Sequence, residues 1–295
     1  MASVSSERPM NYLITGAARG IGRGLTRTLL SRGHRVYLLD ANSAELENTL
    51  GLASSWAAKS PSALSSSSPS DRPFNGAVVD LADRAALKHA VKQADSSFFH
   101  GRLDVLVNNA FATPHVWSAE RRMDDEDDAI EREWDTKIAV GLTAPFLLAR
   151  LCVPMLKAAR GEGEQRPPGC IVNVSSTRAW QAEPNHEAYS AAKAGLLGLT
   201  RSMAVSLGET YGIRVNAVTP GWVDVDDENA AADREGRRWG QALGEADHAW
   251  HPAGRVGRVE DVARAVLFLA ESGFVTAEEV VLDGGVSRKM VYPEE

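Results

Sequence analysis

A tyrosine and a lysine stand four residues apart in the segment Tyr189-Ser190-Ala191-Ala192-Lys193. On a helix this spacing places both side chains on one face. A phenol with its ordinary pKa of about 10 is a poor acid or base at neutral pH, but an adjacent ammonium stabilises the phenolate and lowers that pKa. The pair therefore predicts proton exchange with a carbinol or carbonyl oxygen.

Ser176 adds a hydroxyl to this pair, since it directly follows the apolar run that ends in Val174 and Ser175. We expect this run to be a buried strand and the Ser176 hydroxyl to hydrogen-bond the same substrate oxygen. A Tyr and a Lys at this spacing are usually surface residues of a helix. Their combination with a serine at a strand end and with a glycine-rich turn favours catalysis.

The glycine-rich turn is Thr15-Gly16-Ala17-Ala18-Arg19-Gly20-Ile21-Gly22, which joins the first apolar run to a helical pattern. Glycine lets the backbone turn tightly and approach a pyrophosphate without a Cβ clash. The free amides and the positive dipole end of the following helix would face the same anion. Between a strand and a helix, this pattern predicts a dinucleotide site.

Asp40 ends the second apolar run, about 20 residues after the glycines. A carboxylate there accepts hydrogen bonds from both ribose hydroxyls of NAD and repels the 2′-phosphate of NADP. Arg19 argues the other way, because a guanidinium beside the turn pairs with that phosphate. Repulsion between a carboxylate and a nearby phosphate costs more free energy than an arginine without a phosphate partner, so we expect NAD rather than NADP.

The elements that must position these residues alternate along the chain. Short β-branched runs are separated by segments with helical spacing; the runs are Tyr12–Thr15, Arg35–Leu39, Gly76–Val79, Val105–Val107, Cys170–Val174, Arg214–Val218 and Val280–Leu282. Such alternation predicts right-handed crossovers and a parallel sheet with helices on both faces. We therefore expect a single doubly wound α/β domain over residues 1–295, with about seven strands.

Three segments fall outside this rhythm, and one of them, residues 161–169, is a polar Gly/Pro loop before the fifth strand. Residues 54–70 are Ser-rich and predict a mobile surface excursion. Residues 224–250 are charged and helix-prone and follow the sixth strand. They are either a solvated pair of helices or a lid, and we favour the lid because loops beyond the carboxyl ends of strands border the ligand crevice.

Composition excludes several classes of protein. Among the 295 residues 44% are hydrophobic and 24% charged, and the net charge of -7 argues against a broad nucleic-acid surface. No signal peptide and no apolar run long enough to span a membrane is expected. The two cysteines, Cys152 and Cys170, predict buried free thiols rather than a bridge, and hence a cytoplasmic protein.

Taken together, these motifs make the chain resemble the short-chain dehydrogenase/reductase family from about Asn11 to Tyr292. Besides the glycine turn and the Tyr-x-x-x-Lys pair, the shared landmarks are Asp80-Leu81, Asn108-Asn109-Ala110, Pro220-Gly221, the segment 255–263 and Asp283-Gly284-Gly285. The resemblance implies a Rossmann fold, a nicotinamide cofactor and a homodimer or homotetramer formed through the helices that hold Phe146 and Tyr189.

The resemblance also implies residue roles. Tyr189 would be the general acid/base, Lys193 would lower its pKa and hold the nicotinamide ribose, and Ser176 would orient the substrate. Asp80 would lie by the adenine, with Leu81 beside it. The remaining cofactor contacts would come from backbone and apolar groups, at Asn109, Ala110, Val174, Pro220, Gly221 and Val223.

Three departures from the family pattern are present. Gly141 stands where the family usually carries an Asn that helps to hold a water next to the lysine. Val225 replaces a usual Thr, so that one hydrogen bond to the carboxamide is absent. Phe111 follows Asn-Asn-Ala where Gly is common, which crowds the site or supplies an apolar wall. The acid/base pair itself is intact, so we expect an active enzyme.

Candidates for substrate contact are Phe111, Trp180, His186 and Trp222, which follow strand ends or precede Tyr189. For each, plain packing or a polar helix start is the alternative. No metal is expected, because His115 and His251 lack neighbours at ligand spacing and the acidic run 124–128 lacks the alternation of a calcium loop.

These observations predict reversible alcohol–ketone oxidoreduction on a small or medium apolar substrate. Two alternatives stay open. One is a cofactor-bound scaffold for a non-redox step, and the other is a nucleotide-binding regulatory protein with weakened chemistry.

Overall fold

The computed structural model describes residues 8–60, 72–157 and 167–290. Within them, seven parallel strands form one sheet in the order β3-β2-β1-β4-β5-β6-β7. The strands are β1 (Asn11–Thr15), β2 (Arg35–Asp40), β3 (Phe74–Val78), β4 (Val105–Asn108), β5 (Cys170–Val174), β6 (Arg214–Pro220) and β7 (Glu279–Leu282). The predicted doubly wound α/β fold is confirmed, and each predicted strand is present.

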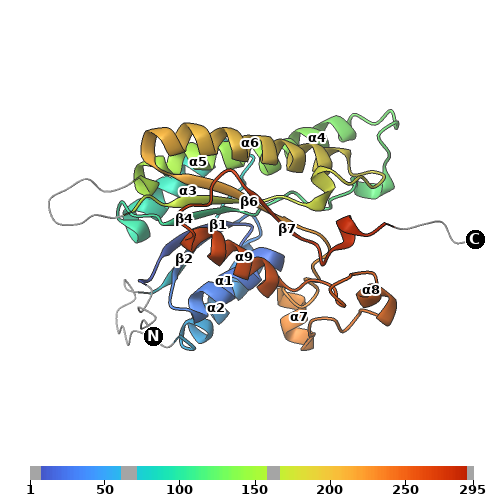
Figure 1. Ribbon diagram of the computed structural model, residues 1–295, viewed down its shortest axis with the longest axis horizontal. Coiled ribbons are helices and arrows are strands. Elements are labelled where there is room, and N and C mark those ends of the chain that lie inside the picture. Colours follow the sequence, from blue (N-terminus) through green and yellow to red (C-terminus); the bar gives the residue numbers. More distant parts are fainter. Residues whose placement is uncertain (1–7, 61–71, 158–166, 291–295) are drawn as a thin grey trace, which may run out of the picture.

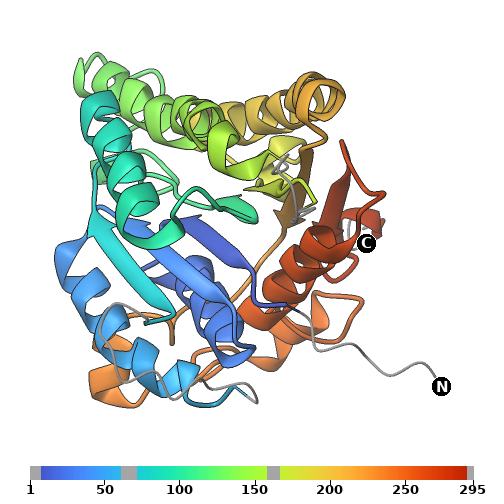
Figure 2. The ribbon, with the colours of Figure 1, turned by 90° about the vertical axis from the view of Figure 1, so that its left-hand side faces the viewer.

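Helices cover both faces of this sheet (Figure 1). They are α1 (Gly20–Ser31), α2 (Ser43–Ala57), α3 (Arg84–Ala94), α4 (Ala129–Ile138), α5 (Ala144–Leu156), α6 (Glu187–Tyr211), α7 (Ala230–Glu235), α8 (Glu245–Ala249) and α9 (Val259–Glu271). Single turns of other helix types are η2 (Asp95–Phe99), η3 (Ser118–Glu120), η4 (Ala139–Thr143), η5 (Thr177–Ala179) and η6 (Val286–Arg288). One layer holds α1, α2 and α9, and the other holds α3 to α6 (Figures 1 and 2).

The central strands β1, β2, β4 and β5 are apolar on both faces, since helices cover the sheet on both sides. In β1, Tyr12 and Ile14 belong to the core beneath α1, α2 and α9. Leu13 belongs to the core on the opposite face, beneath α3 to α6. The alternation follows from the strand period of two residues. Each strand is thereby fixed in register from both sides, which holds the residues at its carboxyl end in place.

The strand order defines where a ligand fits. From β1 the chain continues outward to β2 and β3 in one direction and, through β4, to β7 in the other. In open α/β sheets the crevice for a ligand opens at this reversal, beyond the carboxyl ends of the strands. The glycine turn follows β1 and Ser176 follows β5, so both lie at this edge.

Helix α2 corrects one expectation from the sequence. It continues to Ala57, so residues 54–57 of the predicted Ser-rich excursion are helical. The physical reason is burial, since Trp56 and Ala53 pack into the core that α1, α2 and α9 cover. Residues 61–70 of the predicted excursion and 161–166 of the predicted polar loop lie outside the described residues.

The run Ala129–Leu156 is long and apolar enough to cross a membrane by length and composition. It consists of α4, η4 and α5, and Leu148, Cys152 and Leu156 are buried in the core on the α3–α6 side. This packing makes it a core helix of the domain. Cys152 and Cys170 are buried free thiols, as predicted.

Candidate active site

A crevice of about 1060 Å³ opens at the carboxyl ends of the strands. Most predicted site residues line it, namely Gly16, Arg19, Gly20, Ile21, Asp40, Asp80, Leu81, Asn109, Ala110, Phe111, Val174, Ser176, His186, Tyr189, Lys193, Pro220, Gly221, Trp222 and Val223. Gly22 and Trp180 do not line it. A crevice of this size accommodates a dinucleotide together with a small substrate.

The glycine turn is held in place by the end of β4. The Asn109 side-chain amide donates to the carbonyl oxygens of Thr15 and Gly16, at 3.1 and 3.0 Å. Gly16 has a φ of +61°, and a Cβ there would lie 2.8 Å from the Cα of Ala110. Glycine is therefore required at position 16 for both conformation and space. The Asn109 side chain thus braces the turn, a role that the sequence did not predict for it.

Gly22 acts in packing and does not face the crevice. A Cβ at this position would lie 2.0 Å from the carbonyl oxygen of Gly16. The start of α1 can approach the turn closely because this Cβ is absent. The first-turn amides of α1 lack intrahelical acceptors, as at any helix start, and give this end of the crevice its positive character.

Residues 225–229 form a wall over the glycine turn. The Gly20 amide donates to the carbonyl oxygen of Glu228 at 2.8 Å, and Val225, Asp226, Glu228 and Asn229 line the crevice. Val225, the departure from the family's Thr, lies 3.9 Å from where a Cβ of Gly20 would stand. The start of the predicted lid segment thus borders the glycine turn, and α7 and α8 follow it.

A buried ion-pair network anchors this wall to α1. The Glu228 carboxylate pairs with Arg27 and lies 3.5 Å from Nε of Arg23, whose Nη2 lies 2.7 Å from Asp233. The side chains of Arg23 and Glu228 are both buried. The wall and the helix that carries the glycine turn are therefore joined by charge as well as by the backbone.

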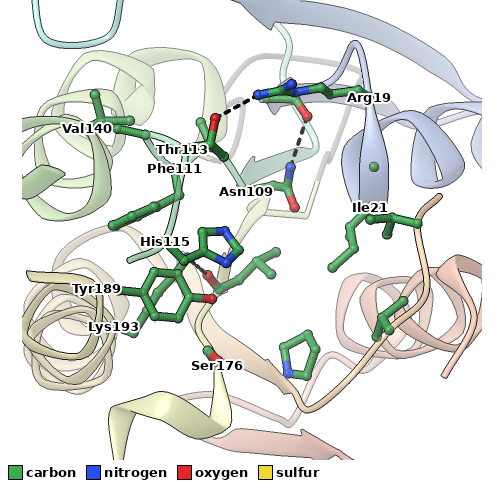
Figure 3. A pocket seen from close by; sticks show the side chains of 18 of the residues that line it. Arg19, Ile21, Asn109, Phe111, Thr113, His115, Val140, Ser176, Tyr189 and Lys193 are labelled. Atoms are coloured by element: carbon green, nitrogen blue, oxygen red, sulfur yellow. Dashed lines mark hydrogen bonds between the residues drawn. The ribbon is translucent and has the colours of Figure 1, made fainter. Parts of the chain in front are cut away.

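Asp40 presents its carboxylate at the crevice. Its two oxygens accept from the amides of Ala18 and Asn42, at 3.0 and 2.9 Å. Arg19 reaches instead toward the loop after β4, where its Nη2 donates to the Thr113 hydroxyl at 2.8 Å (Figure 3). The acid at the end of β2 is thus oriented by the turn, and the nearby guanidinium is bonded to Thr113.

Tyr189, Lys193 and Ser176 come together on the opposite side of the crevice (Figure 3). The first two lie near the start of α6, and Ser176 follows β5 immediately before η5. The Lys193 ammonium donates to the carbonyl oxygen of Val174 at 2.7 Å and lies 5.6 Å from the centre of the Tyr189 ring. The three side chains that the sequence singled out for proton transfer therefore share one site.

Burial dominates the acid/base properties of the pair. It raises the pKa of Tyr189, opposed by a hydrogen bond with Ser176 and by the charge of Arg178. It lowers the pKa of Lys193 to about 8. In the free protein the phenol is therefore protonated at neutral pH, and the net lowering of its pKa that the sequence predicted is not found.

Aromatic rings enclose Tyr189. The ring of Phe111 meets it edge-on at 4.7 Å, and the ring of His115 stacks on it at 4.4 Å with an interplanar angle of 25°. Phe111 also lies 5.4 Å from the Lys193 ammonium. Burial and the nearby Lys193 lower the pKa of His115 to about 4, so this imidazole is neutral at pH 7.

His115 stood out in the sequence only as a possible metal ligand, and Arg178 belongs to no motif that the sequence singled out. Both line the crevice, and Arg178 follows Ser176 by two residues, which is a signal that could have identified it. His186 lines the crevice with its ring 6.1 Å from that of Tyr189. Trp180 is directed to β7, where its Nε1 donates to Glu279 at 3.0 Å, because its indole finds an acceptor there.

Comparison with known proteins agrees with this geometry. A family model described as enoyl-(acyl carrier protein) reductase matches residues 16–287. An uncharacterized oxidoreductase of Thermotoga maritima is 33% identical over 287 residues, covering 96% of this chain and 97% of its own. A 3-oxoacyl-(acyl-carrier-protein) reductase of the same organism is 33% identical, with 93% and 96% covered. The structure of levodione reductase matches with a TM-score of 0.74 and 26% identity, covering 96% of this chain and all of that one.

The chain belongs to the short-chain dehydrogenase/reductase family of oxidoreductases. Members of this family use a nicotinamide cofactor. The glycine turn, the start of α1 and the oriented carboxylate of Asp40 fit such a dinucleotide.

Proposed function

We propose that this protein transfers a hydride between NAD and an alcohol or ketone, with Tyr189 as the general acid/base. The observation that carries the proposal is the arrangement of one crevice. The phenol, the Ser176 hydroxyl and the Lys193 ammonium lie on one side, across from Arg19 and Ile21 of the glycine turn (Figure 3). Asp40 lines the same crevice and accepts a hydrogen bond from Ala18 of that turn. A bound nicotinamide supplies or accepts the hydride.

The remaining chemistry belongs to the chain. In the direction of ketone reduction, the protonated phenol of Tyr189 donates its proton to the substrate oxygen as that oxygen gains negative charge. Ser176 donates a hydrogen bond to the same oxygen and so orients it. The Lys193 ammonium, held by the Val174 carbonyl, stabilises the phenolate that remains. In the direction of alcohol oxidation the proton returns along the same path.

Asp40 supports NAD over NADP. Two backbone amides fix its carboxylate at the end of β2, where a ribose 2′-hydroxyl would bond to it and a 2′-phosphate would be repelled. The bond of Arg19 to Thr113 occupies one donor of the group that would otherwise favour the phosphate. A measured affinity for NADPH ten times that for NADH would contradict this assignment.

The experiment that tests the function compares wild type with Tyr189→Phe. Absorbance at 340 nm would be followed against a panel of ketones with NADH and of alcohols with NAD. We expect turnover by the wild type and its loss in the variant, because phenylalanine keeps the ring packing and removes the proton. NADH affinity, measured by fluorescence titration, would stay nearly unchanged. A phenylalanine variant that keeps most of its activity would show the mechanism to be wrong.

We further propose that copies of this chain associate through α5 and α6. Exposed apolar side chains lie on these helices and on α4, at Trp134, Phe146, Val205 and Tyr211. Sedimentation of wild type and Phe146→Glu would distinguish a dimer or tetramer from a monomer. The cytoplasmic location expected from the sequence stays a prediction.

A further inference from the structure

The charged side chains that line the crevice are unevenly distributed. The acids near the glycine turn and the cofactor side are Asp40, Glu45, Asp80, Asp226 and Glu228. Around Tyr189 the lining residues that the structure describes include two cations, Arg178 and Lys193, and one acid, Glu183. Among these three side chains the cations outnumber the acid by one. Such an excess favours an anionic substrate.

Arg178 is the cation that a substrate can reach. Lys193 is buried and bonded to Val174, whereas the side chain of Arg178 is 28% exposed. Its backbone amide donates to the Ser176 hydroxyl oxygen at 3.2 Å, so its position is fixed relative to the group that would orient the reacting oxygen. The short turn η5 carries it at the crevice wall.

A carboxylate of the protein already occupies this guanidinium. Nη2 of Arg178 pairs with one oxygen of Glu183, and the other oxygen lies 3.6 Å from Nε2 of His186. The Glu183 side chain is 47% exposed, and it belongs to the loop between η5 and α6. An exposed ion pair of this kind contributes little to stability, so a second carboxylate can replace it.

The fork of the guanidinium matches a carboxylate in geometry as well as in charge. Two parallel N–H groups of an arginine bind both oxygens of such a group at once. Among the described residues, Glu183 accepts from the guanidinium of Arg178 at one nitrogen, Nη2. The other N–H groups of the guanidinium are not used by Glu183. A ligand carboxylate that uses two donors would gain over Glu183.

We propose that Arg178 binds a carboxylate of the substrate in place of Glu183, and that the substrates are short oxo acids or hydroxy acids. The inference rests on the proposed function, because it places the reacting carbonyl at Ser176 and Tyr189. Arg178, Ser176 and Tyr189 line the same crevice, and the charge of Arg178 acts on the Tyr189 phenol, so a short substrate can reach all three groups. The substrate is thus more polar than the apolar molecule expected from the sequence, with Phe111 and Trp222 as its apolar walls.

Isothermal titration calorimetry with malonate tests the proposal without any turnover. Malonate would be titrated into the protein with and without NADH, and dimethyl malonate, of similar shape and without charge, serves as the control ligand. We expect malonate to bind in the millimolar range or tighter and the ester not to compete with it. Absence of malonate binding by the wild type would overturn the proposal.

Three variants sharpen the test. Arg178→Met should weaken malonate binding about tenfold or more, since a charge-assisted pair is lost. Arg178→Lys, which keeps the charge and loses the fork, should lie between. Glu183→Gln should strengthen binding about threefold, because the competing carboxylate is gone. Equal binding by wild type and Arg178→Met, or weaker binding by Glu183→Gln, would contradict the assignment.

The outcome is separable from that of the proposed function. Tyr189→Phe leaves Arg178 in place, so it should bind malonate as the wild type does. Malonate binding without turnover of any ketone would reject the oxidoreductase proposal and leave the carboxylate site standing. Should Arg178→Met fail to fold by circular dichroism, Glu183→Gln and Arg178→Lys decide the matter.

Discussion

The ring of Phe111 fills the space that Gly141 leaves beside Lys193. A Cβ at position 141 would lie 2.6 Å from Cε2 of Phe111 and 3.0 Å from the Cβ of Ala192. The two departures from the family pattern are therefore coupled. A large ring at position 111 requires a residue without a side chain at 141, and the volume given elsewhere to an amide and a water is taken here by an aromatic ring.

Gly141→Asn tests this coupling. In the presence of Phe111 the new side chain overpacks the site, and we expect a loss of roughly 2 kcal/mol in the free energy of unfolding. In a Phe111→Gly background the same substitution should cost much less, because the space is free. Urea unfolding of the two single variants and the double variant gives the coupling energy. Additive effects would show that the two residues are independent.

Lys193→Met should stabilise the free protein while it abolishes turnover. Burial lowers the pKa of Lys193 from 10.5 to about 8, so at pH 7 the folded protein carries a desolvated charge. The shift corresponds to a cost of about 3 kcal/mol, and the methionine variant loses about 1 kcal/mol of stabilisation because the Val174 carbonyl no longer accepts a side-chain hydrogen bond. We expect a gain of roughly 1–2 kcal/mol in urea unfolding at pH 7.

The sign of the pH dependence provides a check on Lys193. Its pKa is lowered on folding, so the unfolded state binds more protons between pH 8 and 10.5. The stability of the wild type should therefore gain from this residue as the pH rises through that window, and Lys193→Met should lack the gain. A methionine variant less stable than the wild type at pH 7 would contradict the assignment.

His34 should make the protein sensitive to acid. Its ring is 3% exposed, accepts from the Met10 amide at 3.2 Å and has a pKa lowered from 6.5 to about 4, first by desolvation and then by Arg32. The folded state binds fewer protons than the unfolded state in this window, so stability is full above pH 6.5 and falls toward pH 4. The loss is about 3 kcal/mol.

His34→Gln removes this titration and keeps an acceptor near Met10. The difference in unfolding free energy between wild type and variant, followed by urea titration from pH 7 to pH 4, isolates the histidine from the carboxylates that titrate in both. We expect the difference to shift in favour of the variant as the pH falls. Parallel curves would show that His34 does not titrate in this range.

Glu228→Gln should destabilise the wall over the glycine turn. It leaves Arg23 buried with one fewer charged partner. Burial raises the pKa of Glu228 to about 7, so the comparison is made at pH 8, where the pair is charged and loss of one member costs roughly 3 kcal/mol. Glu260→Gln is the matched control, because Glu260 also pairs with Arg27 but is 42% exposed and should contribute about 0–1 kcal/mol. Urea unfolding of both variants provides the comparison. Similar losses in the two would contradict the anchoring role.

The sequence predicted the sheet well because the central strands are apolar on both faces. Strand ends were less accurate, since they depend on partners: β6 extends to Pro220 because Pro220 pairs with Leu282, and β3 starts at Phe74 opposite Val36. Helix α2 ran into the Ser-rich segment because Trp56 is buried, which local composition does not report.

The candidate site was predictable where chemistry lies in short motifs, as in the glycine turn and the Tyr189–Lys193 pair. It was not predictable where residues far apart in the chain meet. The stacking of His115 on Tyr189 depends on how the loop after β4 folds over α6, and no local pattern encodes it. Trp180 follows the end of β5, as the sequence predicted, but its side chain bonds to Glu279 on β7 and does not line the crevice.

The contact between Gly22 and Gly16 also limits how this protein can be redesigned. With 2.0 Å between the carbonyl oxygen of one and a methyl group on the other, even alanine at position 22 would force the helix away from the turn. Libraries intended to change cofactor choice should therefore vary positions 19 and 40, whose side chains face the crevice, and hold position 22 constant. Variants at position 22 would fail to fold, so they could not be selected for a change in nucleotide preference.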